Sequence, residues 1–192
     1  MLAILLNVFI FYLICSLSYF SIIGFGNIIK INNQNKFLYY NLSFLYGNLI
    51  LIFFGFIFSL LNIKSSFANL SFLLFGLIIF ILNYKKDNKN FIFFSFLIIL
   101  FLFSCLLISK PHDDFLGYHF SLIKYVSISK PILGIANIET HFVNGSFLVY
   151  LQKFFFLPYF NFKLIHIPIF LIYVNIIILL TYLSIKNINF FI

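Results

Sequence analysis

Two adjacent aspartates carry the strongest chemical signal in this sequence of 192 residues. Asp113 and Asp114 follow His112 directly and come shortly before His119 and Lys124. A carboxylate that lies beside a reacting hydroxyl can act as a general base, and a lysine or histidine can neutralise a departing anion. We therefore take the two aspartates as catalytic candidates, and His112, His119 and Lys124 as candidates for substrate binding.

Groups that can act as acids, bases or metal ligands gather in one part of the chain. The sequence has four acidic residues and four histidines, and all of them except Asp87 lie between residues 112 and 166. Costly polar groups in an apolar protein usually mark function. Simpler interpretations stay open, because Asp114 could be a helix N-cap and Glu139 a solvated loop residue.

A metal site is the weaker interpretation of the same residues. Asp113, His119 and His141 could supply ligands, but their spacing matches no established pattern. We therefore expect no resident metal. The last histidine, His166, fits a hydrogen-bonded residue at the membrane interface better than a ligand.

The composition places these groups in a membrane protein. Hydrophobic residues make up 64% of the chain and charged residues only 8%, whereas soluble domains are about 25% charged. A soluble fold of this size would expose large apolar patches, but lipid accepts such a surface. The net charge of +8 comes from lysines that flank apolar runs, which is typical of membrane anchors and not of nucleic-acid binding.

Five apolar runs are long enough, or nearly so, to cross a bilayer as helices, since a span needs about 20 apolar residues. A sixth run, Phe147–Leu157, is shorter, includes Gln152 and Lys153, and ends before Pro158, so it predicts an interfacial or re-entrant helix. The fold class is therefore all-α, a polytopic transmembrane helix bundle of about five spans, with six as the alternative. The five runs are Leu2–Ile23, Leu42–Leu61, Phe67–Leu82, Phe91–Ser109 and Leu164–Ile185.

A few polar and sulfur-containing side chains lie inside these runs. Asn7 and Asn175 are expected to form hydrogen bonds with neighbouring helices. Cys15 and Cys105 are expected to be small buried side chains, with no disulfide framework.

Lysine placement predicts which connections share a side of the membrane. The connection 84–90 holds three lysines, and the connection between the first two runs holds two. The positive-inside rule places both connections in the cytoplasm. The short turn around Lys64 and the loop 110–163 then lie on the outer face.

After Pro111, the sequence predicts an amphipathic helix. Apolar residues recur at helical spacing, with polar residues on the opposite side. Such a helix would lie on the membrane surface and hold the two carboxylates at the boundary with water. Its expected apolar face is Phe115, Tyr118, Leu122 and Val126, and its expected polar face is Ser121, Lys124 and Ser127.

An apolar span, an outer loop that opens with Asp-Asp and a surface helix together resemble the multi-spanning C-type glycosyltransferases. The segments HDDFLGYHF (112–120) and GIANIETHFVNGSFLVYL (134–151) are similar to one bacterial subgroup of membrane proteins related to these enzymes. The resemblance covers 91–185. It divides the chain into three N-terminal spans (1–90) and the start of a glycosyltransferase-like core (91–192), which comprises span 91–109, outer loop 110–163 and span 164–185.

The resemblance implies inverting sugar transfer from a polyprenyl-phosphate-linked sugar, in the assembly of envelope polysaccharide or glycolipid at the bacterial inner membrane. Asp113, or else Asp114, would act as general base on the acceptor hydroxyl while the lipid phosphate leaves. Lys124, His119 and His112 would lie near that phosphate. No cofactor is implied, and a divalent cation is the alternative means of neutralising the phosphate.

Family members continue with many further spans, so we expect this chain to be a truncated or partial member. Two other functions stay open beside sugar transfer. A non-catalytic membrane subunit or scaffold would pack its spans against a larger partner. A small transporter would need polar groups near the middle of several spans, which these runs lack.

Overall fold

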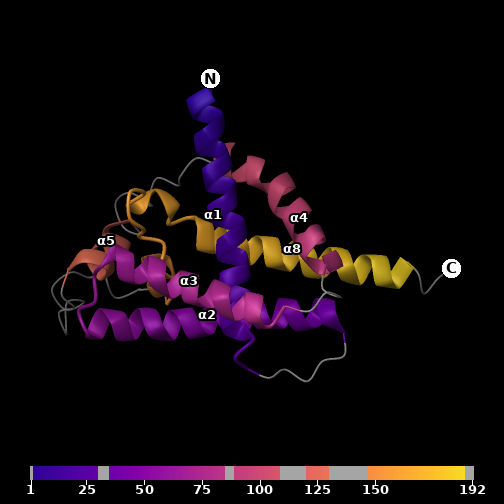
Figure 1. Ribbon diagram of the computed structural model, residues 1–192, viewed down its shortest axis with the longest axis horizontal. Coiled ribbons are helices and arrows are strands. Elements are labelled where there is room, and N and C mark those ends of the chain that lie inside the picture. Colours follow the sequence, from indigo (N-terminus) through magenta and orange to yellow (C-terminus); the bar gives the residue numbers. More distant parts are fainter. Residues whose placement is uncertain (1, 30–34, 85–88, 109–119, 130–146, 189–192) are drawn as a thin grey trace.

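The computed structural model describes residues 2–29, 35–84, 89–108, 120–129 and 147–188. It confirms the all-α fold: within these residues the backbone forms helices and turns, and the only strand-like pairing is an isolated bridge (Figure 1). The helices are α1 (Leu2–Gly26), α2 (Lys36–Leu60), α3 (Ser66–Leu82), α4 (Lys89–Ile108), α5 (Phe120–Ile128), α7 (Leu148–Lys153), the short 3-10 helix η4 (Phe162–Leu164) and α8 (Ile167–Ile188).

Each of the five predicted runs corresponds to a helix. Three helical segments, Leu5–Gly26, Lys36–Leu60 and Phe162–Ile185, are long and apolar enough to cross a membrane. Two more apolar segments, Ser66–Leu82 and Lys89–Cys105, are shorter. This architecture is compatible with a membrane protein.

The starts of α2 and α3 are fixed by polar caps. Asn35 Oδ1 accepts hydrogen bonds from Phe37 N at 3.1 Å and Leu38 N at 3.4 Å. Ser65 Oγ accepts one from Ala68 N at 3.4 Å. Because these caps satisfy backbone donors that have no partner within the helix, α2 begins earlier than its apolar run.

Helices α1, α2 and α3 form the centre of the fold and approach one another closely at glycines. A Cβ atom at Gly24 would overlap the carbonyl oxygen of Gly76, and one at Gly47 would overlap that of Ile22. Figure 1 shows α1 crossing α2 and α3 and extending beyond them. Small residues permit such close backbone packing between helices in lipid. The fully buried aromatic side chains at this crossing are Tyr19, Phe25 and Phe44.

Buried hydrogen bonds link α8 to α1 and α2. Tyr19 OH donates to Asn175 Oδ1 at 3.0 Å, and Asn175 Nδ2 donates to the carbonyl oxygen of Asn41 at 3.4 Å. The prediction that Asn175 bonds to a neighbouring helix is thus confirmed. Asn7, for which the same bond was expected, lies on the exposed face of α1.

The two cysteines differ in burial. Cys15 is buried, as the sequence predicts. For Cys105 that prediction is wrong, because its side chain is exposed. Helix α4 buries a stripe through Ile99 and Phe103, and Cys105 lies off that stripe.

The helix ends gather at two ends of the molecule. At the first, which we call the Phe37 end, the Phe37 ring stacks on Tyr182 with 4.7 Å between centroids and contacts Phe91 at 5.4 Å. The starts of α2 and α4 and the end of α8 therefore meet there, as the predicted alternation of spans requires. The other end, which we call the α7 end, contains the turn 61–65, α5, α7 and η4 (Figure 1).

Candidate functional site

Lys124 is the one predicted site residue that the structure describes. Its side chain is exposed on α5, at the α7 end. Asp113, Asp114, His112 and His119 lie outside the described residues, as do the other two acidic residues of the chain. Within the described residues, no three His, Cys, Asp or Glu side chains are grouped so as to hold a metal ion.

The buried face of α5 differs from the predicted apolar face, of which Phe115 and Tyr118 lie outside the described residues and Val126 is half-buried. Leu122 is buried as expected, but Ser127 is buried as well, although it was assigned to the polar face. The apolar cluster of this helix consists of Leu122 and Ile123, which pack with Val149 of α7 and Ile165 before α8. Because α7 and the segment before α8 cover this side, the buried face is rotated toward Ile123 and Ser127.

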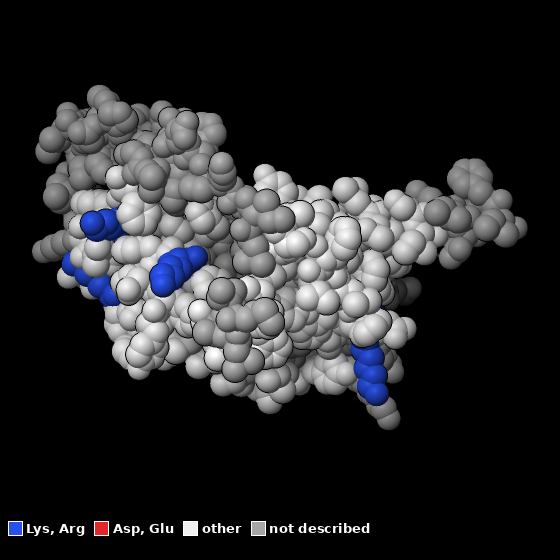
Figure 2. All heavy atoms as spheres, turned by 90° about the horizontal axis from the view of Figure 1, so that it is seen from above, with Lys and Arg blue, Asp and Glu red and all other residues white. Residues whose placement is uncertain are grey.

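The α7 end carries most of the described positive charge. Lys64 lies in the turn before α3, Lys124 on α5, Lys153 at the end of α7 and Lys163 in η4. Figure 2 shows lysine side chains at both ends of the molecule, with more of them on the side of the α7 end. The described side chains of this end therefore offer charge of the sign that favours anions.

Lys153 is only 1% exposed, which is rare for a lysine. Its ammonium donates a hydrogen bond to Ser59 Oγ at 3.0 Å, the one acceptor that it has among the described residues. Ser59 Oγ in turn donates to the carbonyl oxygen of Gly55 at 3.0 Å. Burial, together with the like charge of Lys64, lowers the pKa of Lys153 to about 8. The amine thus becomes largely neutral in mildly alkaline solution.

A glycine on α2 brings this lysine to its serine. A Cβ atom at Gly55 would overlap the backbone carbonyl of Tyr150. The close contact between α7 and α2 therefore requires glycine at position 55. Ser59 lies one turn beyond Gly55, and Lys153 lies about one turn beyond Tyr150. The close contact at the glycine therefore places the two side chains opposite each other.

The end of α7 is held by α3. Asn69 Nδ2 donates to the carbonyl oxygens of Lys153, at 2.9 Å, and of Phe156, at 3.0 Å. The expected helix ran up to Pro158, but α7 ends at Lys153. Asn69 shares the Lys153 carbonyl with Phe156 N, which donates to it at 3.1 Å, and it satisfies the Phe156 carbonyl beyond the helix, which permits the chain to turn before the proline.

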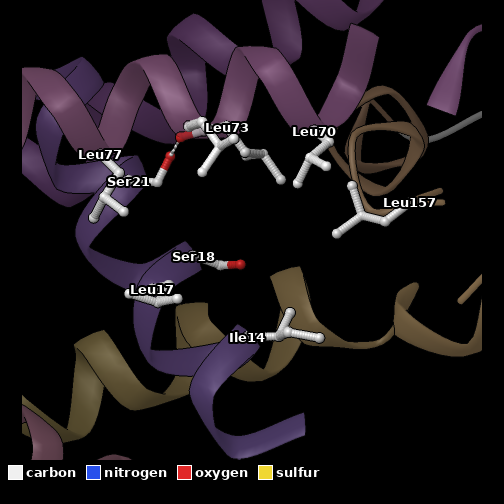
Figure 3. Close-up of a pocket in the computed structure, with 9 residues that line it drawn as sticks. Ile14, Leu17, Ser18, Ser21, Leu70, Leu73, Leu77 and Leu157 are labelled. Atoms are coloured by element: carbon white, nitrogen blue, oxygen red, sulfur yellow. Dashed lines mark hydrogen bonds between the residues drawn. The ribbon is translucent and has the colours of Figure 1, made fainter. Parts of the chain in front are cut away.

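An apolar cavity of ≈ 90 Å³ lies between α1 and α3. Figure 3 shows the Ser21 hydroxyl bonded to the carbonyl of Leu73, so that this polar group is satisfied within the wall. Ile14, Leu70 and Leu157 are among the residues that surround the space. No titratable side chain lines it, so the cavity can take up hydrocarbon but has no group for acid–base chemistry.

The sequence does not predict Ser59 and Lys153 as site residues. The available signal is a lysine inside the apolar run FLVYLQKFFFL (147–157). Its partner lies 94 positions away on another helix, and no spacing rule connects the two. Only the packing of α7 on α2 reveals the pair.

Comparison of the chain with protein-family models, with curated proteins and with solved structures found no match.

Proposed function

We propose that this chain is a protein of the bacterial inner membrane that transfers sugar from a polyprenyl-phosphate-linked donor in envelope polysaccharide or glycolipid assembly. The observation that carries the proposal is the positive charge at the α7 end, where Lys124 and Lys163 are exposed. The aspartate pair precedes α5 by a few residues in the sequence, so the proposed base and this charge belong to one segment of the chain.

The donor and the protein match in chemical character. A polyprenyl-phosphate sugar has a long hydrocarbon chain, an anionic phosphate and a polar sugar. The apolar helices offer surface to the hydrocarbon, and the lysines favour the phosphate, most of all when it leaves with an additional charge. In this proposal Asp113 removes the proton from the acceptor hydroxyl, and Asp114 is the second choice for that role. The loop 110–163 would face the outside.

The test uses the full chain in lipid vesicles that contain a radiolabelled polyprenyl-phosphate sugar and an extract of candidate acceptors. Release of label from the lipid phase measures transfer. Loss of a general base typically costs about 10²-fold or more in rate, so we expect a reduction of this size for Asp113→Asn. Asp87→Asn is the matched control, because Asp87 is the acidic residue outside the proposed segment.

Two results would contradict the proposal. Wild-type rates in both Asp113→Asn and Asp114→Asn would remove the assigned base. Absence of transfer in vesicles that hold donor and acceptors would favour a non-catalytic membrane subunit, which should then co-purify with a larger membrane protein.

A further inference from the structure

We infer that Ser59 and Lys153 form a nucleophile–base pair that accepts an acyl group from a lipid ester, an activity separate from sugar transfer. The 3.0 Å between Lys153 Nζ and Ser59 Oγ is within the range for direct proton transfer. A serine activated by a lysine is one of the recurring forms of nucleophilic catalysis.

The hydrogen-bond pattern around Ser59 permits the proton to move. In the charged state, Lys153 donates to Ser59 Oγ, and the serine hydroxyl donates to the carbonyl of Gly55. A neutral amine has a free lone pair, and a serine hydroxyl can rotate toward it. The same short contact then has the hydroxyl as donor and the lysine nitrogen as acceptor, which is the arrangement that activates the serine.

A purely structural role explains only part of this arrangement. Serines in membrane helices often bond to the carbonyl four residues earlier, which accounts for the contact with Gly55. It does not account for Lys153, since an ammonium buried with one acceptor among the described residues destabilises the fold where an apolar residue would not. A buried lysine that destabilises the fold is typical of groups that do chemistry.

The surroundings of the pair favour a substrate with a hydrocarbon chain. Phe154 and Phe155, which follow Lys153, are fully buried, and Leu60 and Leu61, which follow Ser59, are 53% and 66% exposed. The serine thus lies beneath an apolar surface at the end of a helix that is long and apolar enough to cross a membrane. These apolar surroundings suit the acyl chain of a lipid, whereas a polar ester would lose its hydration there.

The reaction has two balanced halves. Ser59 Oγ forms a bond to the ester carbonyl carbon while its proton passes to Lys153 Nζ. The tetrahedral intermediate then breaks its bond to the alcohol oxygen, and the alcohol leaves with that proton. In the second half, water attacks the acyl-serine with Lys153 again as base, which releases the fatty acid and restores the serine.

Nearby charges support both halves. Burial and the charge of Lys64 hold the pKa of Lys153 at about 8, so the amine can act as a base near neutral pH. Lys64 is half-buried in the adjacent turn and favours the negative charge on the intermediate. The other described titratable groups on or beside the elements that pack on α7 are Tyr150 on α7 itself, Lys36, Tyr39, Tyr40 and Tyr46 on α2, Lys124 and Tyr125 on α5, Tyr159, Lys163 and His166 between α7 and α8, and Tyr173 and Tyr182 on α8.

The test treats the full chain in detergent with a long-chain alkyl fluorophosphonate, which transfers its phosphonyl group to an activated serine and releases fluoride. Mass spectrometry then locates the modified residue. We expect modification of Ser59, about tenfold faster at pH 9 than at pH 7, because the neutral fraction of an amine with a pKa near 8 rises by about that factor. Ser184, which bonds to the carbonyl of Leu180 at 2.9 Å, is the internal control and should stay unmodified.

The variants separate base catalysis from folding. Lys153→Met should lose the modification, and Lys89→Met, at the Phe37 end, should keep it. Lys153→Arg retains a cation that can bond to Ser59 but has no usable base, so it should elute as a folded protein and still lose the modification. Wild-type modification in Lys153→Arg, or an unmodified Ser59 in the folded wild-type protein, would overturn the proposal.

Discussion

Replacement of Lys153 by methionine should change how the stability of the protein depends on pH. The folded-state pKa of about 8 lies below the ordinary value of 10.5. Between these two values the unfolded chain binds more protons than the folded chain, so the free energy of unfolding rises with pH. Below pH 8 the folded protein carries the full cost of a buried ammonium.

The size of the effect follows from the two pKa values. At pH 7 the cost of the charged Lys153 is on the order of 3 kcal/mol, and at pH 9.5 it has fallen to roughly 1 kcal/mol. The wild-type protein should therefore gain about 2 kcal/mol relative to Lys153→Met over this interval. Methionine fills a similar volume and leaves Ser59 bonded to Gly55, so the variant should be the more stable protein at pH 7.

Equilibrium unfolding in mixed micelles, followed by helical circular dichroism, measures this difference. The free energy of unfolding is measured for both proteins at pH 7 and at pH 9.5. Lys89→Met serves as the control, because Lys89 lies at the Phe37 end with an exposed side chain and should show no such change relative to the wild type. A stability difference between wild type and Lys153→Met that stays constant with pH, or that moves in the opposite direction, would refute the reasoning.

Three further predictions concern packing and the two ends. Gly24→Ala should lower thermal stability in detergent by several degrees, because its new Cβ would overlap the carbonyl of Gly76, and unchanged melting would show that the crossing can widen. Asn69→Ala should destabilise the protein by about 1–3 kcal/mol in mixed-micelle unfolding, since the carbonyl of Phe156 loses its donor and that of Lys153 keeps only Phe156 N, and a neutral result would mean that water replaces the amide. Cysteines placed at Lys89 and Lys124 should react with a membrane-impermeant maleimide from opposite sides of a bilayer, and labelling of both from one side would contradict the topology.

The helices could be predicted from the sequence because their signal is local. Apolar runs of Phe, Leu and Ile locate the five long helices of the described residues, and they miss some of the boundaries, such as the start of α2 that Asn35 caps. Burial within a helix is harder to predict, as Cys105 and Ser127 show. Which face is buried depends on neighbours that a single run does not reveal.

The residues of the candidate site also differ in whether local sequence or tertiary packing determines them. Lys124 was predicted to lie on the polar face of its helix and is exposed there, while the roles of Asp113 and Asp114 stay predictions outside the described residues. Ser59 and Lys153 depend on two helices packing at a glycine, which is a tertiary contact. A polar residue in an apolar run signals that a partner exists but does not identify it.

The hydrogen bonds of Asn175 have a consequence for the order in which the protein assembles. Helix α8 follows α1 and α2 in the chain, so during synthesis Tyr19 and Asn41 enter the membrane before the amide that bonds to them. The glycine contacts among the early helices do not involve α8, whereas the buried amide of Asn175 acquires these two partners only when α8 docks onto them. A register shift of one residue would turn that amide away from both partners. The early helices therefore act as a template that sets the depth and rotation of α8, and an α8 supplied as a separate chain should recover the same position.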